Sequence, residues 1–193
     1  MAGDERPMRG GTRRGRTVRV VLWALLPVAT VVGVYWFGRA HTPAYATSLF
    51  GTRFGDAQQL KAELGTALLG LALIQLLLAL WLYGRLPGLG TAPRPVGRIH
   101  RLVGLAAFLL SLPIARHCLV AYGVELTDAR TALHSLSGCF LYGAFVAKVI
   151  VVRHRRLPGW VLPVAGGALV LTIALLWYSA AFWHLNAFNA PGL

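Results

Sequence analysis

Acidic residues are scarce in this sequence: six are aspartate or glutamate, against nineteen that are lysine or arginine. Charged residues of both signs make up only 13% of the 193 residues, whereas 56% are hydrophobic and the mean hydropathy is +0.62. A water-soluble domain of this length needs a larger charged surface. The composition therefore excludes an ordinary soluble domain.

Cysteine is also rare, with only Cys118 and Cys139 present. Neither belongs to a CxxC or CxxCH motif, which excludes covalent attachment of a c-type haem and a zinc knuckle. Both cysteines are expected to be small, buried apolar residues.

Long apolar runs make up most of the sequence. About 20 residues of helix cross a hydrocarbon core of roughly 30 Å, and a helix satisfies its own backbone polar groups in lipid. The sequence therefore predicts an all-α membrane protein with five transmembrane helices. Short connections arrange the last four, residues 60–185, as an up-down bundle. The predicted spans are 18–38, 60–83, 99–123, 131–152 and 160–185.

Arginine is distributed unevenly between the predicted connections. The tail 1–17, predicted to be disordered, and the links 84–101 and 153–159 all fall on one side and carry most of the arginines. The positive-inside rule places this side in the cytoplasm and the C-terminus outside the plasma membrane. The basic charge then serves topology and contact with anionic membrane lipids, and no nucleic acid is expected as a partner.

The first apolar run has two interpretations. "RRGRTVRV", the run and "AYA" at 44–46 resemble a cleavable signal peptide. The run of about 20 residues exceeds the usual apolar core of a signal peptide, which favours a retained helix. Cleavage stays an open alternative.

Two histidines lie near the same predicted membrane surface. His117 falls near the end of the third span and His134 near the start of the fourth, so antiparallel helices bring them to a similar depth. This depth predicts the two axial ligands of a haem b. Gly138, four residues after His134, leaves room for the macrocycle, and Arg116 and Arg130 suit its propionates. The alternative is an interfacial pair that hydrogen-bonds the outer loop.

Other histidines offer alternative ligands. His184, near the outer end of the fifth span, lies diagonally from His117, and a haem needs more room than the roughly 8–10 Å between adjacent helix axes. His100, with Gly104 on its face, lies at the cytoplasmic edge, where a second haem is conceivable. His154 belongs to an arginine cluster, which favours a solvated charge run.

Two more polar residues interrupt the apolar runs. Lys148 lies about one turn from the cytoplasmic boundary, so its side chain can extend to the surface. Gln75 lies in the middle of its span, where an interhelical hydrogen bond is the expected role. His41, just after the first span, is expected at the interface.

The stretch "GRIHRLVGLAAFLLSLPIARHC", followed by "LHSLSGCFLYGAFVAKVIVVR" and "LPGW", resembles a family of small actinobacterial multi-helix membrane proteins of unknown function. The resemblance covers about 57–185 and places His100, His117 and His134 at landmark positions. More loosely, the chain is similar to cytochrome b561 and ferric-reductase-type transmembrane domains, which bind haem b and pass electrons across the membrane. The span 60–83 has no histidine, so a full two-haem site of the b561 type is not implied.

The leading hypothesis is a b-type cytochrome-like membrane subunit with a haem near the outer face. It would relay electrons between a quinone or a redox partner subunit and an extracytoplasmic acceptor, within a hetero-oligomer. The alternative is a cofactor-free structural or assembly subunit of a larger respiratory complex. A small transporter is disfavoured because no inverted repeat with broken helices is visible.

Overall fold

The computed structural model describes residues 13–153 and 158–192, and every regular element in these ranges is a helix. His154, together with residues 1–12 of the tail, lies outside the described residues. In chain order the elements are α1 (Arg13–Ala40), α2 (Phe54–Leu82), α3 (Arg94–Ala121), α4 (Ala129–Arg153), α5 (Val161–Leu176), η1 (Trp177–Phe182) and α6 (Trp183–Leu185). The last three form one continuous helix, Val161–Leu185.

Four helices are long and apolar enough to cross a membrane: α2, α3, α4 and Val161–Leu185. The all-helical fold is confirmed, with four helices that could span a membrane. The described apolar part of α1 is the shorter segment Leu25–Ala40, so the structure does not confirm a fifth span. The helix α1 already begins at Arg13, inside the tail that was predicted to be disordered.

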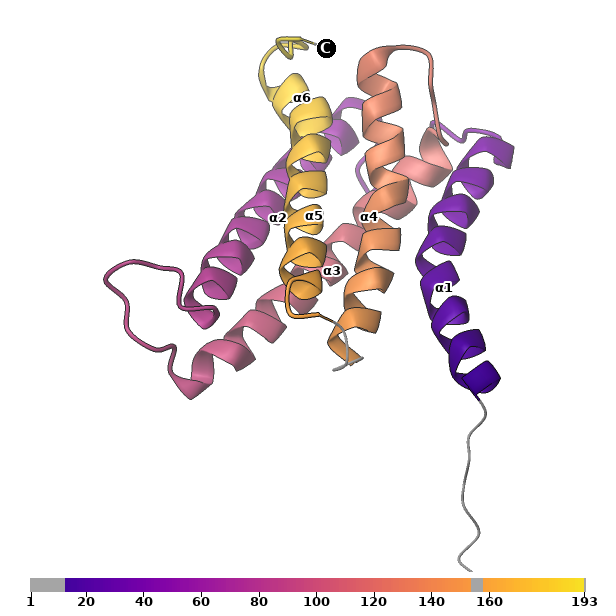
Figure 1. Cartoon of the computed structure of the whole chain (residues 1–193). Helices are drawn as coiled ribbons and strands as arrows, with labels where there is room; N and C mark the ends of the chain where they lie inside the picture. The colour runs from indigo at the N-terminus through magenta and orange to yellow at the C-terminus, as the bar shows by residue number, and fades with distance from the viewer. Residues whose placement is uncertain (1–12, 154–157, 193) are drawn as a thin grey trace, which may run out of the picture.

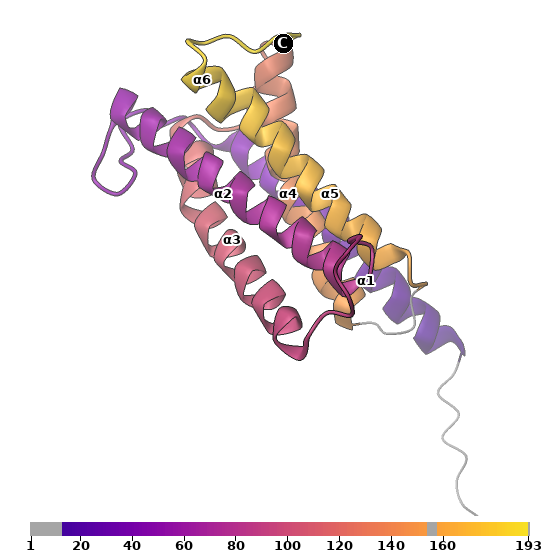
Figure 2. The same cartoon turned by 90° about the vertical axis from the view of Figure 1, so that its left-hand side faces the viewer.

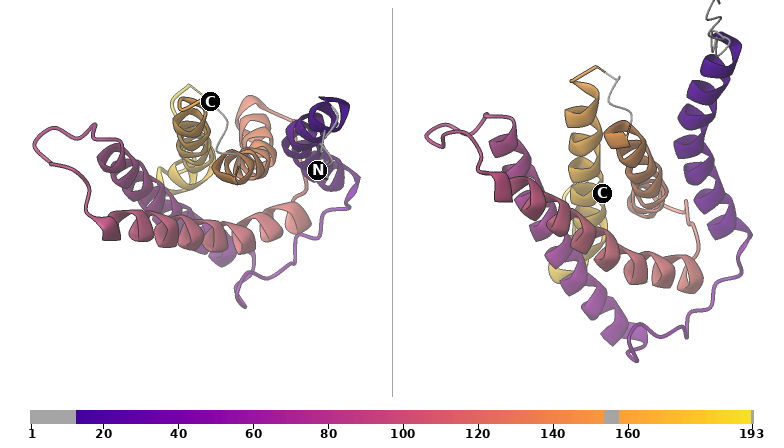
Figure 3. Two further views of the ribbon diagram at one scale, coloured as in Figure 1. Left: turned by 60° about the horizontal axis from the view of Figure 1, so that its bottom comes forward. Right: turned by 90° about the horizontal axis from the view of Figure 1, so that it is seen from below.

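Four helices, α2, α5, α4 and α1, lie next to one another, and α3 runs across them at an angle. The helix α2 packs against α3 and α5, while α4 packs against α5 and, on its other side, α1 (Figure 1). Turned by 90°, α2 and α3 run side by side in front of the others (Figure 2). Seen from below, α3 runs at an angle across α5 and α4 (Figure 3). The helices α3 and α4 follow one another in sequence, but they pack less extensively than the four pairs just named.

The middle of the bundle is held together by direct side-chain contacts. A buried apolar cluster joins α2, α3, α4 and α5. Next to it, the rings of Phe108 and Phe145 lie 4.7 Å apart, and the Tyr142 hydroxyl donates to the Ser111 carbonyl over 3.2 Å. These contacts hold α3 and α4 together at mid-height.

One end of the bundle is fastened by an amide. The Gln75 side chain donates a hydrogen bond to the His100 carbonyl, which confirms the interhelical role predicted for Gln75. Gly104 makes this possible, because a Cβ there would lie 2.9 Å from Gln75 Nε2. We call this the inner end. The opposite end, which carries the connections 41–53 and 122–128, is the outer end.

Candidate functional site

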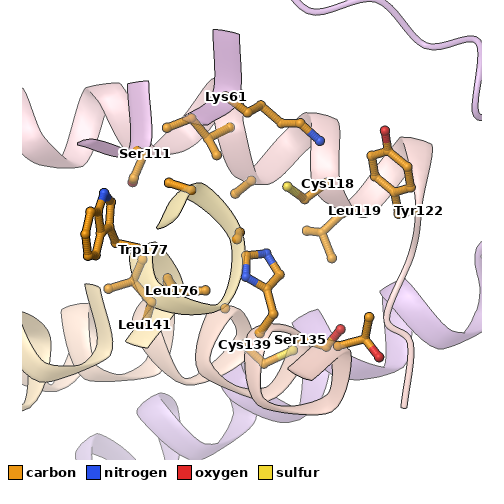
Figure 4. A pocket seen from close by; sticks show the side chains of 18 of the residues that line it. Lys61, Ser111, Cys118, Leu119, Tyr122, Ser135, Cys139, Leu141, Leu176 and Trp177 are labelled. Atoms are coloured by element: carbon orange, nitrogen blue, oxygen red, sulfur yellow. The ribbon is translucent and has the colours of Figure 1, made fainter. Parts of the chain in front are cut away.

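A cavity of about 410 Å³ opens between the outer halves of α2, α3 and α4 and the end of the helix Val161–Leu185. Its volume falls within the roughly 300–1,000 Å³ that is usual for small-molecule sites. Its walls are largely apolar. Lys61 and Cys118 lie across it from Ser135 and Cys139, and Trp177 lies to one side (Figure 4).

A π-helical turn shapes one wall of the cavity. In η1 the backbone accommodates an extra residue per turn, which changes the face that the following residues present. This turn contains Ser179, which is completely buried. Nearby, Trp177 Nε1 donates to the Thr66 hydroxyl over 3.0 Å and ties η1 to α2. The π turn therefore directs a buried hydroxyl toward the neighbouring helix α4.

His134 lines the cavity, and its tautomer follows from this hydroxyl. Ser179 donates its own proton to the Leu175 carbonyl over 2.7 Å. His134 Nδ1 lies 3.2 Å from Ser179 Oγ, and because the Ser179 proton is used in the shorter bond to Leu175, we assign Nδ1 as the donor of this hydrogen bond. The lone pair is then on Nε2. An imidazole that is oriented through Nδ1 and carries a lone pair on Nε2 is prepared to bind a metal.

His117 has a different environment. Its side chain is 2% exposed, and Nε2 lies 3.0 Å from the Thr47 carbonyl in the connection 41–53. It does not belong to the lining of the cavity. The structure therefore does not bring His117 and His134 to one site; the hydrogen bond instead matches the alternative role in the outer loop. His41 behaves likewise, with Nε2 3.2 Å from the Val120 carbonyl.

His184 is the second histidine of the cavity lining. Its Nε2 lies 3.1 Å from Gln59 Oε1, and its Nδ1 is buried without a hydrogen-bond partner among the described residues. The cavity thus brings together His134 and His184, the alternative haem ligand from the last helix. His100 lies outside the lining, beside Gln75 at the inner end.

The two predicted glycines also differ. Gly138 lines the cavity, and a Cβ there would lie 3.9 Å from Leu176, an ordinary contact. Gly104 lies outside the lining, where it leaves space for the Gln75 amide. Of these two glycines, only Gly138 therefore lies at the cavity.

A family model described as a family of unknown function, DUF6529, matches residues 20–192. The chain belongs to this family. No curated protein and no solved structure matches it. Membership of DUF6529 confirms the predicted resemblance to a family of unknown function, whereas the cytochrome b561 resemblance and the actinobacterial origin stay predictions.

Of the two arginines predicted to suit the haem propionates, Arg130 lines the cavity of this DUF6529 chain and Arg116 does not. The Arg130 guanidinium lies 3.9 Å over the Trp183 ring and donates to the Ser179 carbonyl over 3.1 Å. Arg116 is exposed and lies outside the cavity lining. Lys61 lines the cavity, with its ammonium 4.3 Å from the centre of the Tyr122 ring. Lys61 was not predicted as a site residue, although a lysine at the predicted start of a span was a usable signal.

The donor set of the cavity is limited. Among the described residues, no group of three or more His, Cys, Asp or Glu side chains is arranged to hold a bare metal ion. Haem iron takes only one or two axial side chains from the protein, often histidine. His134 and His184 are the imidazoles that this DUF6529 cavity offers for such a role.

Proposed function

We propose that this protein is a b-type cytochrome-like membrane subunit that holds haem b in the outer cavity, with His134 as an axial ligand. The observation that carries the proposal is the 3.2 Å contact between His134 Nδ1 and Ser179 Oγ, which, with Nδ1 as the assigned donor, leaves the Nε2 lone pair available on the cavity wall. The largely apolar lining suits the macrocycle, and polar residues of the rim suit its propionates. His184 is the second candidate ligand, in place of His117.

The residues of the chain have separate roles in this proposal. Ser179 orients the imidazole, Arg130 fixes the Ser179 carbonyl from α4, and apolar residues such as Leu141 and Ile173 keep water from the site. A bound haem would supply one-electron chemistry. The subunit would then relay electrons between a quinone or redox partner subunit and an extracytoplasmic acceptor.

The proposal includes a membrane topology with five spans. The helix α1 lies along α4 so closely that a Cβ on Gly143 would meet Val31 and the Pro27 carbonyl. This close packing supports α1 as the additional span. The arginines of the tail and of the two inner links support a cytoplasmic N-terminus and an outer C-terminus in the plasma membrane.

Histidine substitutions test the proposal. His134→Ala should abolish the haem absorbance of the detergent-purified protein, because it removes the axial nitrogen. His117→Ala is the matched control: it removes a buried imidazole of the same outer end, and it should retain haem. Ser179→Ala should bind haem more weakly, since the imidazole loses its orienting partner.

Size-exclusion profiles and thermal unfolding would show whether each variant is folded. Equal haem content in the folded His134→Ala variant and the wild type would contradict the proposal. A wild type without haem, expressed with ample haem supply, would favour the cofactor-free structural or assembly subunit instead.

A further inference from the structure

Lys61 directs a positive charge into a largely apolar cavity. It projects from the outer end of α2 toward Tyr122 and Cys118 (Figure 4). Its ammonium contacts the face of the Tyr122 ring, 4.3 Å from the centroid. In the described part of the chain it makes no ion pair within 4 Å and no hydrogen bond. A cation–π contact leaves the three N–H donors of an ammonium without acceptors.

The other cations near the cavity do not share this condition. Arg130 also lines the cavity, but its guanidinium already stacks on the Trp183 ring and donates from one nitrogen to the Ser179 carbonyl. Arg116 is exposed and outside the lining. Lys61 therefore stands out as the cavity cation whose three N–H donors are not used by described residues.

A second donor lies beside Lys61. The Gln58 amide donates to the Tyr122 hydroxyl over 3.4 Å, and both residues line the cavity. Because this hydroxyl accepts from Gln58, its own proton remains available for another acceptor. An ammonium and a hydroxyl donor at one end of a largely apolar cavity suit a carboxylate. Glu125 also lines the cavity, but it forms no ion pair with Lys61.

We propose that Lys61 is the counter-ion for a carboxylate of the ligand, so that the outer cavity takes an amphipathic carboxylate. The proposal rests on the proposed function for the location of the ligand. It goes further because it names the recognised group and replaces Arg116 and Arg130 in the propionate-binding role. A haem propionate and the head of a long-chain fatty acid share this chemistry, and the experiment distinguishes them.

The experiment measures two ligands on the full-length chain in detergent. One arm titrates haem and follows its absorbance; the other titrates the fluorescent fatty acid cis-parinaric acid and its methyl ester. Lys61→Met should weaken binding of the carboxylate ligand about tenfold or more, as the loss of a charge-assisted contact does. Lys61→Arg should restore most of the affinity. Arg116→Met, a matched loss of an outer cation, should bind like the wild type.

Each outcome decides between the proposals. Binding of haem that depends on Lys61 supports both, whereas binding of parinaric acid alone, lost in Lys61→Met and absent for the methyl ester, supports the carboxylate site and contradicts the haem. Equal carboxylate affinity in the folded Lys61→Met variant and the wild type overturns the role of Lys61. A wild type that binds neither ligand overturns it as well.

Discussion

The outer and inner halves of the bundle differ in how their helices meet. In the middle and inner parts, α2, α3 and α4 touch through Phe108, Phe145 and the Gln75 amide. In the outer half the same helices surround a cavity of about 410 Å³. Buried contacts stabilise a bundle, whereas space with polar groups on its walls accommodates a ligand. The buried cluster and the Gln75 hydrogen bond therefore contribute mainly to stability, whereas the outer cavity has the polar groups that a ligand needs.

The largest expected difference concerns two leucines on α5, two helical turns apart. Leu169 is 6% exposed in the buried cluster, whereas Leu176 lines the cavity. Leu169→Ala should lower the free energy of unfolding by about 3 kcal/mol, because it creates a new void. Leu176→Ala should cost about 1 kcal/mol, because that side chain already borders empty space. Chemical unfolding in mixed micelles measures both; equal losses would remove the distinction between the halves.

Two glycines should show the same contrast on a smaller scale. Gly104→Ala places a Cβ 2.9 Å from Gln75 Nε2 and should destabilise the protein by about 2 kcal/mol. Gly138→Ala makes only a 3.9 Å contact with Leu176 and should change stability by less than about 0.5 kcal/mol. Thermal unfolding of the two variants in one detergent tests this pair. A larger loss of stability in Gly138→Ala than in Gly104→Ala would contradict this difference between the two sites.

The Gln75 amide should contribute less to stability than the packing at Leu169 or at Gly104. Gln75→Leu keeps the volume but removes the hydrogen bond to the His100 carbonyl, so it should cost about 1 kcal/mol. The outer cavity should be unaffected. Ligand affinity measured alongside stability checks this separation, and a Gln75→Leu variant with normal stability but impaired ligand binding would contradict it.

The smallest effect is expected at the outer start of α4. Asp128 Oδ1 accepts a hydrogen bond from the Thr131 N–H over 2.9 Å, and Oδ2 accepts one from the Thr131 hydroxyl over 2.8 Å. These bonds favour the ionised carboxylate and lower the pKa of Asp128. The stabilisation is therefore present above the pKa of the unfolded chain and is lost as the pH falls through the lowered folded value.

Asp128→Ala should accordingly melt slightly below the wild type at neutral pH. The two melting temperatures should converge in strong acid, and Asp128→Asn should keep part of the stabilisation. A difference in melting temperature that is independent of pH down to strong acid would show that the charge of Asp128 does not matter.

Hydropathy was sufficient to predict the four long helices, because a membrane span is defined by its length and composition. It was not sufficient to pair the histidines. Depth along a helix does not determine facing, since each residue turns the direction by about 100°. His117 faces the connection 41–53, and only the folded loop supplies the Thr47 carbonyl that binds it.

The site itself could be predicted only in part. His134 and Gly138 were identified from sequence and do line the cavity, as does the alternative ligand His184. Ser179 was missed because its position depends on the π turn of η1, which no periodic pattern in an apolar run reveals. Lys61 was missed because a lysine at a predicted helix start resembles an ordinary interfacial residue.

The central claim is that the outer cavity holds a haem through His134, and one measurement tests it most directly. A reduced-minus-oxidised visible spectrum of the detergent-purified wild type, with the haem quantified as its pyridine haemochrome, gives both the type and the amount. We predict the Soret and α bands of a b-type haem at about one haem per chain. A folded, colourless protein from cells supplied with haem would contradict the claim.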